Sequence, residues 1–412
     1  MAVIDVDAPS TRLLMDGTLQ ITAVPRDADG ADMTSIDVSW HSANTSIATV
    51  DDDGLVQGVD YGTTDVIVAA GTLERSLSVE VVPRPVSCAA AGTTATDVAD
   101  SVMWRTADGP FHMQQTVVVN GQLVIESGAL VCGAQDAVLQ IGTTLGGGSL
   151  LSHGAEGDTI VLTAADPDRP WGGILAEHAH EVDLRFVRLE AALNGISSTV
   201  AGQIVVEDAR ISRISGVGIA LRHTDSVSRT TIDGAGTGIS IDYGSPVELR
   251  EVIVRNSTGT GIRLWRSRVG LYDVRVEDSG GDGIVFDGLT GIGPIGATDL
   301  VVTGSVGAGV RISAFDLTLS GCTITGGAAD GVVLTDGSGV AVHGCNLSGN
   351  AGVGVRNPTS FFSVDASLNW WGDPAGPDGP NGDGVSGDVL VMPVLTEPVS
   401  ANRSASESGT QR

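Results

Sequence analysis

The stretch VRVEDSGGDGIVFD (residues 274–287) contains the pattern that decides the fold: a short strand, a small polar turn, a Gly-Ile dipeptide and a second short strand. Gly-Ile or Gly-Val returns through residues 191–360, with successive glycines 20 to 26 residues apart. These glycines are Gly195, Gly218, Gly238, Gly261, Gly283, Gly309, Gly331 and Gly354. A period of about 20–25 residues is typical of a solenoid. Alternation with a period of two fills both halves of each unit and leaves no room for a helix.

When the units are aligned on this glycine, apolar residues recur nine and seven positions before it and three positions after it. Positions two apart in a strand share a face, so each of these columns should point inward. One unit cannot bury its apolar face alone, and successive units must therefore stack. The sequence predicts an all-β protein whose larger part is a right-handed parallel β-helix.

Residues 1–83 have a different pattern, with short alternating segments separated by Gly/Asp turns, which is typical of an all-β sandwich. The stretch 38–70, VSWHSANTSIATVDDDGLVQGVDYGTTDVIVAA, resembles the bacterial immunoglobulin-like group 2 family. The resemblance implies a spacer or adhesion module without catalytic residues. Physically, we expect Trp40 and Val50 to be core residues, and Gly54 and Gly62 to supply turns that need a positive φ.

The remaining boundaries follow from composition and from the regularity of the repeat. We predict a linker at 84–97, a β-helix at 98–398 and a disordered polar tail at 399–412. Within the β-helix we predict N-terminal capping coils at 98–190, regular coils at 191–360 and a C-terminal cap at 361–398.

Three stretches near the ends of the β-helix resemble secreted or surface bacterial β-helix proteins of the pectin-lyase-like superfamily. They are GQLVIESGALV (121–131), PWGGI (170–174) and LNWWGDPAGP (368–377). In the last stretch, we expect Trp370 and Trp371 to cover the last open coil. The superfamily includes pectate lyases, polygalacturonases, uronan epimerases and non-catalytic surface proteins. The catalytic sets of its lyases and hydrolases are not legible here, and fold alone does not give function.

The formal net charge of −28 and the pI of about 4.3 argue against nucleic acid and anionic membranes as partners. Such acidity fits solubility, cation binding or a salt-adapted or GC-rich genome. No apolar run is long enough to span a bilayer, and the first thirty residues lack a signal-peptide pattern. We therefore expect a piece of a longer exported protein, placed outside the cell or on its surface.

Four cysteines are too few for a disulfide framework in a chain of this length. Cys322 and Cys345 fall in the same inward column one coil apart, and buried free thiols are the favoured interpretation. A disulfide between them also fits the spacing of neighbouring coils. Cys88 and Cys132 form the other potential pair in an oxidising compartment.

The candidate ligand-binding residues are polar or aromatic residues predicted to point outward from four consecutive coils. They are Arg222, Asp242, Tyr243, Arg263, Trp265, Arg266 and Asp287. An exposed Trp among Arg and Asp offers a sugar ring an apolar face and hydrogen-bond partners. The alternatives are an Arg222–Asp242 surface salt bridge beside a Trp that packs on its own loop, and a catalytic pair. Asp242 and Asp287 would be about 9–10 Å apart, at the edge of the range for inverting glycosidases.

His178 and His180 in EHAHE would share a strand face and could hold a metal together with Glu177 or Glu181. Two ligands are weak evidence, and exposed loop histidines are the simpler interpretation. We predict no cofactor, with calcium as an open alternative. No nucleophile elbow, zinc or nucleotide-binding motif is present.

These observations favour a non-catalytic carbohydrate-binding or adhesion protein in which the Ig-like spacer displays the β-helix to a polysaccharide or cell-surface glycan. The first alternative is a polysaccharide lyase, hydrolase or epimerase that acts in the β-helix groove. The second is a structural rod within a larger surface protein. The sequence leaves open which glycan is bound, how the protein is anchored and its oligomeric state.

Overall fold

The computed structural model describes residues 3–399, except for residues 16, 28, 34–35, 46, 60–61, 83–86, 156, 223–224, 244–245, 268, 290–295, 315 and 360. The chain divides into two compact units, Met1–Ser87 and Cys88–Arg412. Strands dominate both units, and a 3-10 turn, η1 (Thr106–Asp108), is the one helical element among the described residues. In that part of the chain, no helix has the length and apolar character needed to cross a bilayer.

The first unit is a sandwich of small β-sheets, in which β2 pairs with β9 in parallel and the other pairs are antiparallel. Its strands are β1 (Val3–Asp7), β2 (Arg12–Leu14), β3 (Thr18–Gln20), β4 (Thr22–Arg26), β5 (Val38–Ser42), β6 (Ala48–Val50), β7 (Leu55–Gly58), β8 (Gly62–Ala70) and β9 (Leu73–Val82). Trp40 and Val50 pack against its apolar clusters, as predicted. Gly54 and Gly62 have φ of 77° and 138°, which confirms the predicted turns.

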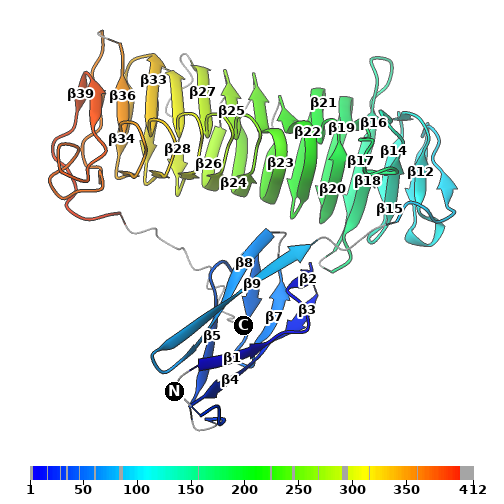
Figure 1. Cartoon of the computed structure of the whole chain (residues 1–412). Helices are drawn as coiled ribbons and strands as arrows, with labels where there is room; N and C mark the ends of the chain where they lie inside the picture. The colour runs from blue at the N-terminus through cyan, green and yellow to red at the C-terminus, as the bar shows by residue number, and fades with distance from the viewer. Residues whose placement is uncertain are drawn as a thin grey trace, which may run out of the picture. The chain divides into compact units, whose positions relative to one another are not determined.

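The second unit is a parallel β-solenoid whose strands stack coil upon coil (Figure 1), and the strand pairings group them into three sheets. Sheet 1 contains β11 (Ser101–Trp104), β14 (Gln122–Ile125), β17 (Ser149–His153), β28 (Gly296–Thr298), β31 (Thr318–Ser320), β34 (Ala341–His343), β37 (Val364–Asp365) and β39 (Val389–Leu390). Sheet 2 contains β10 (Thr93–Thr94), β12 (Phe111–Met113), β15 (Leu130–Gly133), β18 (Ile160–Ala164), β20 (Val187–Ala192), β29 (Val301–Thr303), β32 (Thr323–Thr325) and β35 (Asn346–Ser348).

Sheet 3 contains the strands that begin just after the repeated glycine in the regular coils, together with their counterparts in the coils at the two ends. They are β13 (Val117–Val119), β16 (Val138–Ile141), β25 (Ile262–Trp265), β27 (Ile284–Leu289), β30 (Val310–Ala314), β33 (Val332–Asp336), β36 (Val355–Asn357) and β38 (Val385–Gly387). Longer strands bend at a corner and belong to more than one sheet. They are β19 (Gly173–Arg185), β21 (Ile196–Glu207), β22 (Arg210–Leu221), β23 (Ser226–Asp242), β24 (Val247–Arg255) and β26 (Val269–Glu277). The predicted linker, residues 84–97, contains strand β10, which pairs with β12 and so belongs to the solenoid.

The apolar residues of the predicted inward columns are buried in the core of the solenoid, which also contains residues of sheet 1 such as Leu249 and Leu271. For example, Ile211, Val254 and Val276 lie in one column of sheet 2. On the shorter coil of Gly238, the column is filled by Ile232, six residues before the glycine and one position later than the alignment predicts. Stacking identical or similar branched side chains fills the narrow interior at each level. This arrangement confirms the inward columns expected from the glycine alignment.

The repeated glycine is required by close approach between coils and not by an unusual φ. A Cβ on Gly261 would lie 2.6 Å from the carbonyl oxygen of Gly283 and 2.4 Å from Cγ1 of Val276. The same conflict with the next glycine's carbonyl recurs from Gly195 to Gly331 at 2.2–2.8 Å. None of these glycines has a positive φ. Each coil therefore sits on its neighbour at a point where only hydrogen fits.

Aromatic residues lie near both ends of the solenoid. Trp104 stacks on Phe111 with a centroid distance of 4.9 Å near the first coils. Near the last coils, Trp371 is fully buried and belongs to the main core, while Trp370 is half-buried and bridges to Asn346. The predicted disordered tail falls, from residue 400 on, outside the described residues.

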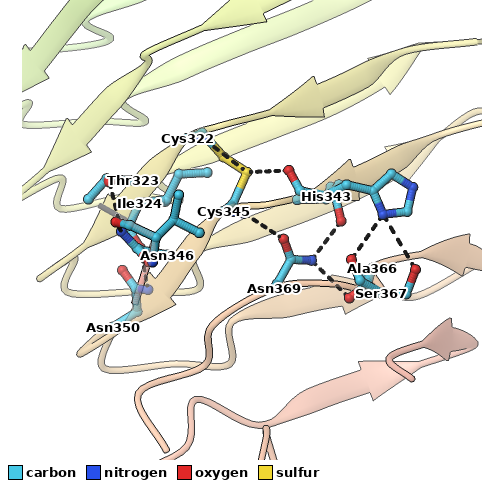
Figure 2. Close-up of a disulfide and its surroundings, with 12 residues drawn as sticks. Cys322, Thr323, Ile324, His343, Cys345, Asn346, Asn350, Ala366, Ser367 and Asn369 are labelled. Atoms are coloured by element: carbon cyan, nitrogen blue, oxygen red, sulfur yellow. Dashed lines mark hydrogen bonds between the residues drawn. A yellow bond between two sulfur atoms is a disulfide. The ribbon is translucent and has the colours of Figure 1, made fainter. Parts of the chain in front are cut away.

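Both candidate cysteine pairs form disulfides, and the expectation of buried free thiols at Cys322 and Cys345 is wrong. Their shared inward column places the two Cα atoms 4.4 Å apart, within bonding range (Figure 2). The other disulfide joins Cys88, the first residue of the second unit, to Cys132 of β15. It fastens the start of the second unit to sheet 2.

We predict that the two disulfides differ in their resistance to a water-soluble reductant. Cys322 and Cys345 are 1% and 0% exposed, whereas Cys88 is partly exposed. Thiol–disulfide exchange requires access of the attacking group, so Cys88–Cys132 should be reduced first under native conditions. Reduction, alkylation and mass spectrometry would measure this order. Equal labelling of all four cysteines in the folded protein would contradict the prediction.

Candidate ligand-binding surface

The register of sheet 3 brings three of the predicted site residues into one column on its outward edge. Asp242 at the end of β23 lies opposite Trp265 of β25, which in turn lies opposite Asp287 of β27. Asp242, Trp265 and Asp287 are each half-buried. The two carboxylates therefore flank the indole, one on the preceding coil and one on the following coil.

Two corner residues add to this column because their backbone conformation is left-handed. Tyr243 has φ 55° and Arg266 has φ 49°, immediately after the end of their strands. The ring of Tyr243 meets that of Trp265 edge to face at 4.4 Å between centroids. The guanidinium of Arg266 lies 5.4 Å from the Trp265 ring and 5.9 Å from the Tyr243 ring. We call Tyr243, Trp265 and Arg266 the aromatic cluster.

The next corner residue on this side of the solenoid is Gly288, which leaves room for the aromatic cluster. A Cβ at Gly288 would lie 3.2 Å from Cγ of Arg266 and 3.3 Å from Nε1 of Trp265. Tyr243 is 55% exposed and Arg266 is exposed, so the cluster faces solvent. Packing by its neighbours holds Trp265 in place, and this rigidity favours ligand stacking.

The carboxylate of Asp242 has a buried oxygen, Oδ1, that has no hydrogen-bond partner among the described residues. Arg222 is exposed at the end of β22, and no ion pair joins it to Asp242 in the described part of the chain. The predicted alternative of an Arg222–Asp242 salt bridge is therefore not observed there. The same alternative included a tryptophan that packs on its own loop. Trp265 does contact the corner residue Arg266 that follows it, and also Tyr243 of the preceding coil.

Arg263 points outward from β25 two residues before Trp265 and is exposed. Further along sheet 3, Arg311 and Arg356 occupy the corresponding outward position, and each bonds an aspartate. Hydrogen bonding to Asp282 raises the pKa of Arg311, and Arg356 holds the pKa of Asp330 below its usual value. These paired arginines provide an internal comparison for Arg263.

The predicted metal ligands His178 and His180 lie in β19 and both are exposed. His178 has φ 55° at an irregularity in the strand register, so the strict alternation that we assumed does not apply there. Glu177 accepts a hydrogen bond from Gln140. No group of three metal-ligating side chains occurs among the described residues.

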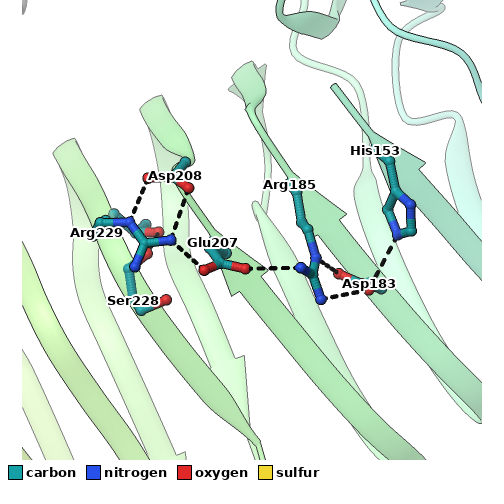
Figure 3. Close-up of polar contacts among 8 residues, drawn as sticks. His153, Asp183, Arg185, Glu207, Asp208, Ser228 and Arg229 are labelled. Atoms are coloured by element: carbon teal, nitrogen blue, oxygen red, sulfur yellow. Dashed lines mark hydrogen bonds and ion pairs between the residues drawn. The ribbon is translucent and has the colours of Figure 1, made fainter. Parts of the chain in front are cut away.

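Sequence reasoning missed a chain of alternating charges on sheet 1 (Figure 3). His153, Arg185 and Glu207 lie opposite one another on successive strands. Arg185 bonds both oxygens of the buried Asp183 at 2.9 and 3.1 Å and reaches Glu207 at 3.2 Å. Hydrogen bonds to Asp183 raise the pKa of Arg185. The charges are largely satisfied by one another, which indicates a structural role.

The far end of this network is equally well satisfied. Arg229 binds Glu207 and also donates to both oxygens of Asp208 at 2.7 and 2.9 Å. Its hydrogen bonds to these carboxylates raise its pKa above the usual value. The spacing from His153 to Arg185 is 32 residues, longer than the glycine period, so alignment on the glycine could not reveal the column.

Ser367, His343 and Asp365 near the last coils have the residue types of a hydrolase triad but the wrong bonding; Figure 2 shows His343 and Ser367. Nδ1 of His343 lies 2.9 Å from the backbone carbonyl of Ser367 and 3.4 Å from its hydroxyl. A hydrogen bond to that carbonyl requires a proton on Nδ1, so this nitrogen is not a base for the hydroxyl. The Ser367 hydroxyl instead bonds Asp365 and lowers its pKa.

Comparisons with known proteins support the two-unit architecture. A family profile described as right handed beta helix region matches residues 194–361, and one described as bacterial Ig-like domain (group 2) matches residues 2–81. A search of curated proteins gives no significant match.

Among solved structures, domains 4 and 5 of the S-layer protein SbsC are 27% identical over 19% of this chain and 53% of that chain, with a TM-score of 0.17. An intimin mutant from EHEC O157:H7 is 27% identical over 19% of this chain and 44% of that chain, with a TM-score of 0.15. The catalytic unit of a GH87 α-1,3-glucanase from Streptomyces thermodiastaticus is 14% identical over 92% of this chain and 86% of that chain, with a TM-score of 0.48. The chain thus covers about half of the first two structures.

Proposed function

The chain joins a bacterial Ig-like domain of group 2 to a right-handed β-helix, and we propose that it is an exported or cell-surface protein whose β-helix binds carbohydrate without turning it over. The Ig-like domain would be the spacer that displays the β-helix. Both disulfides support export, because such bonds form and persist in oxidising compartments.

The observation that carries this proposal is the exposed aromatic cluster of Tyr243, Trp265 and Arg266, flanked by Asp242 and Asp287. A sugar ring has an apolar face that stacks on an indole and hydroxyl groups that donate to carboxylates. The aromatic cluster and the two aspartates beside it offer both kinds of contact at one edge of sheet 3. Asp242, Trp265 and Asp287 lie on strands, and Tyr243 and Arg266 directly follow strand ends, which favours a fixed binding geometry.

We predict that Trp265→Ala weakens glycan retention by about tenfold or more, because a stacked tryptophan is the type of residue that dominates a binding site. Affinity electrophoresis against a panel of neutral and acidic polysaccharides would measure the change. The panel first identifies a retained polysaccharide with the unmodified protein.

Phe361→Ala is the matched control, because Phe361 is an aromatic residue that is 84% exposed and lies outside the aromatic cluster. It should leave retention unchanged. Equal retention of the Trp265→Ala variant and the unmodified protein would refute the proposed binding surface. A lack of retention by any glycan would favour a structural rod.

A second candidate function is cleavage or epimerisation of a polysaccharide between Asp242 and Asp287. It is favoured by their register, which separates them by two coils or about 9–10 Å, near the carboxylate spacing of inverting glycosidases. Release of reducing ends or unsaturated uronates that is lost in Asp242→Asn would establish an enzyme. Retention without products supports the binding function.

A further inference from the structure

The outward position two residues after the repeated glycine alternates between arginine and valine on sheet 3. Arg263, Val285, Arg311, Val333 and Arg356 occupy it on successive coils, and the strand register places them opposite one another. The three arginines thus have the same backbone environment. Their differences must come from neighbouring side chains.

Two of these arginines are neutralised by an aspartate from the preceding coil. Arg311 donates to Asp282 through Nε at 2.6 Å and Nη2 at 2.8 Å. Arg356 donates from Nε and Nη2 to Asp330 in the same way, at 2.5 and 2.9 Å. Both aspartates immediately precede the repeated glycine of their coil. Each also accepts the backbone N–H of the corresponding residue on the next coil, at 2.8 Å.

This position before the glycine carries an acid in these coils where the next coil presents an arginine. On the coil before that of Val285 the position is occupied by Thr260, and on the coil before that of Val333 it is occupied by Ala308; both residues are uncharged. Asn194, which precedes the coil of Ala220, accepts the same backbone N–H from Val217 at 3.1 Å without adding a charge. The residue before the glycine is therefore acidic where the next coil has an arginine and uncharged where the next coil has a valine.

Arg263 is the exception. The residue that precedes the glycine of the preceding coil is Thr237, which has no charge. No acidic partner of Arg263 occurs in the described part of the chain, and its side chain is exposed. It points outward from β25 two residues before Trp265, so its guanidinium lies on the same face of sheet 3 as the indole that the proposed function uses.

From this pattern, and resting on the proposed carbohydrate-binding function, we infer that the ligand is an acidic saccharide whose anionic group is bound by Arg263 while its ring stacks on Trp265. An unpaired guanidinium binds a carboxylate or a sulfate ester through two parallel hydrogen bonds. Uronates and sulfated sugars share this chemistry. The net charge of −28 repels polyanions in general, so retention of one requires a local cation of this kind.

The test introduces an aspartate at position 237, before the glycine of the preceding coil. Thr237→Asp gives Arg263 the partner that Asp282 gives Arg311, and Thr237→Asn is the matched control, because Asn194 already occupies this position without charge. Retention would be measured on dextran and cellulose, each in neutral, carboxymethylated and sulfated forms, and on polygalacturonate. We expect Thr237→Asp to weaken retention of anionic forms by about tenfold and Thr237→Asn to leave it unchanged.

The carboxylated and sulfated arms show which anionic group is preferred. Equal retention of neutral and anionic forms by the unmodified protein would overturn the inference, and so would undiminished retention of anionic forms by Thr237→Asp. The proposed function fails separately, if Trp265→Ala retains every glycan as well as the unmodified protein does. Thermal unfolding of both Thr237 variants verifies that they are folded.

Discussion

Replacing Gly261 by alanine is expected to destabilise the β-helix by about 3 kcal/mol, the upper end of the usual cost of overpacking, because the added methyl group has no space. Its Cβ would lie 2.4 Å from Cγ1 of Val276 and 2.6 Å from the carbonyl oxygen of Gly283. Real Cβ atoms do not approach other heavy atoms this closely. Both neighbours are held by the stacking of the next coil, so relief requires that two coils separate locally and lose hydrogen bonds.

Gly384→Ala is the matched control for this prediction. Gly384 accepts the N–H of Gly354 on the preceding coil, in the same column as Gly261. A Cβ at Gly384 would find its nearest neighbour, Cγ1 of Val353, at 3.9 Å, because no described coil follows. We expect the urea midpoint to fall for Gly261→Ala and to remain unchanged for Gly384→Ala. Similar midpoints for the two variants would show that contact between coils does not explain the repeat.

The glycine column also shows how much of the fold is legible in the sequence. The period and the inward columns predict the stacked coils, because each coil repeats the same packing problem with the same residue types. The sequence does not show that left-handed corners are occupied by Tyr243 and Arg266. Tyrosine and arginine have no special preference for positive φ, so no residue type marks these corners.

The candidate site likewise has a part that the sequence predicts and a part that it does not. The alignment of Asp242, Trp265 and Asp287 follows from their spacing relative to the glycine. The contact between Tyr243 and Trp265 depends on the left-handed corner and could not be predicted. The pairing of Asp282 with Arg311 was available from the same alignment, since it needs only the residue before one glycine and the second residue after the next.

Replacing Trp371 by alanine is expected to destabilise the end of the β-helix by about 3–5 kcal/mol, the usual cost of removing a buried tryptophan. Trp371 is fully buried, and its ring lies where a Cβ on Gly354 would be, with Cζ3 at 2.9 Å. It therefore packs against the coil of Gly354, the last glycine of the repeat. Loss of the ring leaves a cavity at this end of the core.

Hydrogen exchange would locate this effect, because an uncovered solenoid end should fray from that end. We expect faster exchange in β33, β36 and β38 of Trp371→Ala and unchanged exchange in β13 and β16. Trp370→Ala is the control, since Trp370 is only half-buried at the outer edge of sheet 2. A stable Trp371→Ala variant that loses glycan retention would instead assign this tryptophan to ligand binding, which its complete burial argues against.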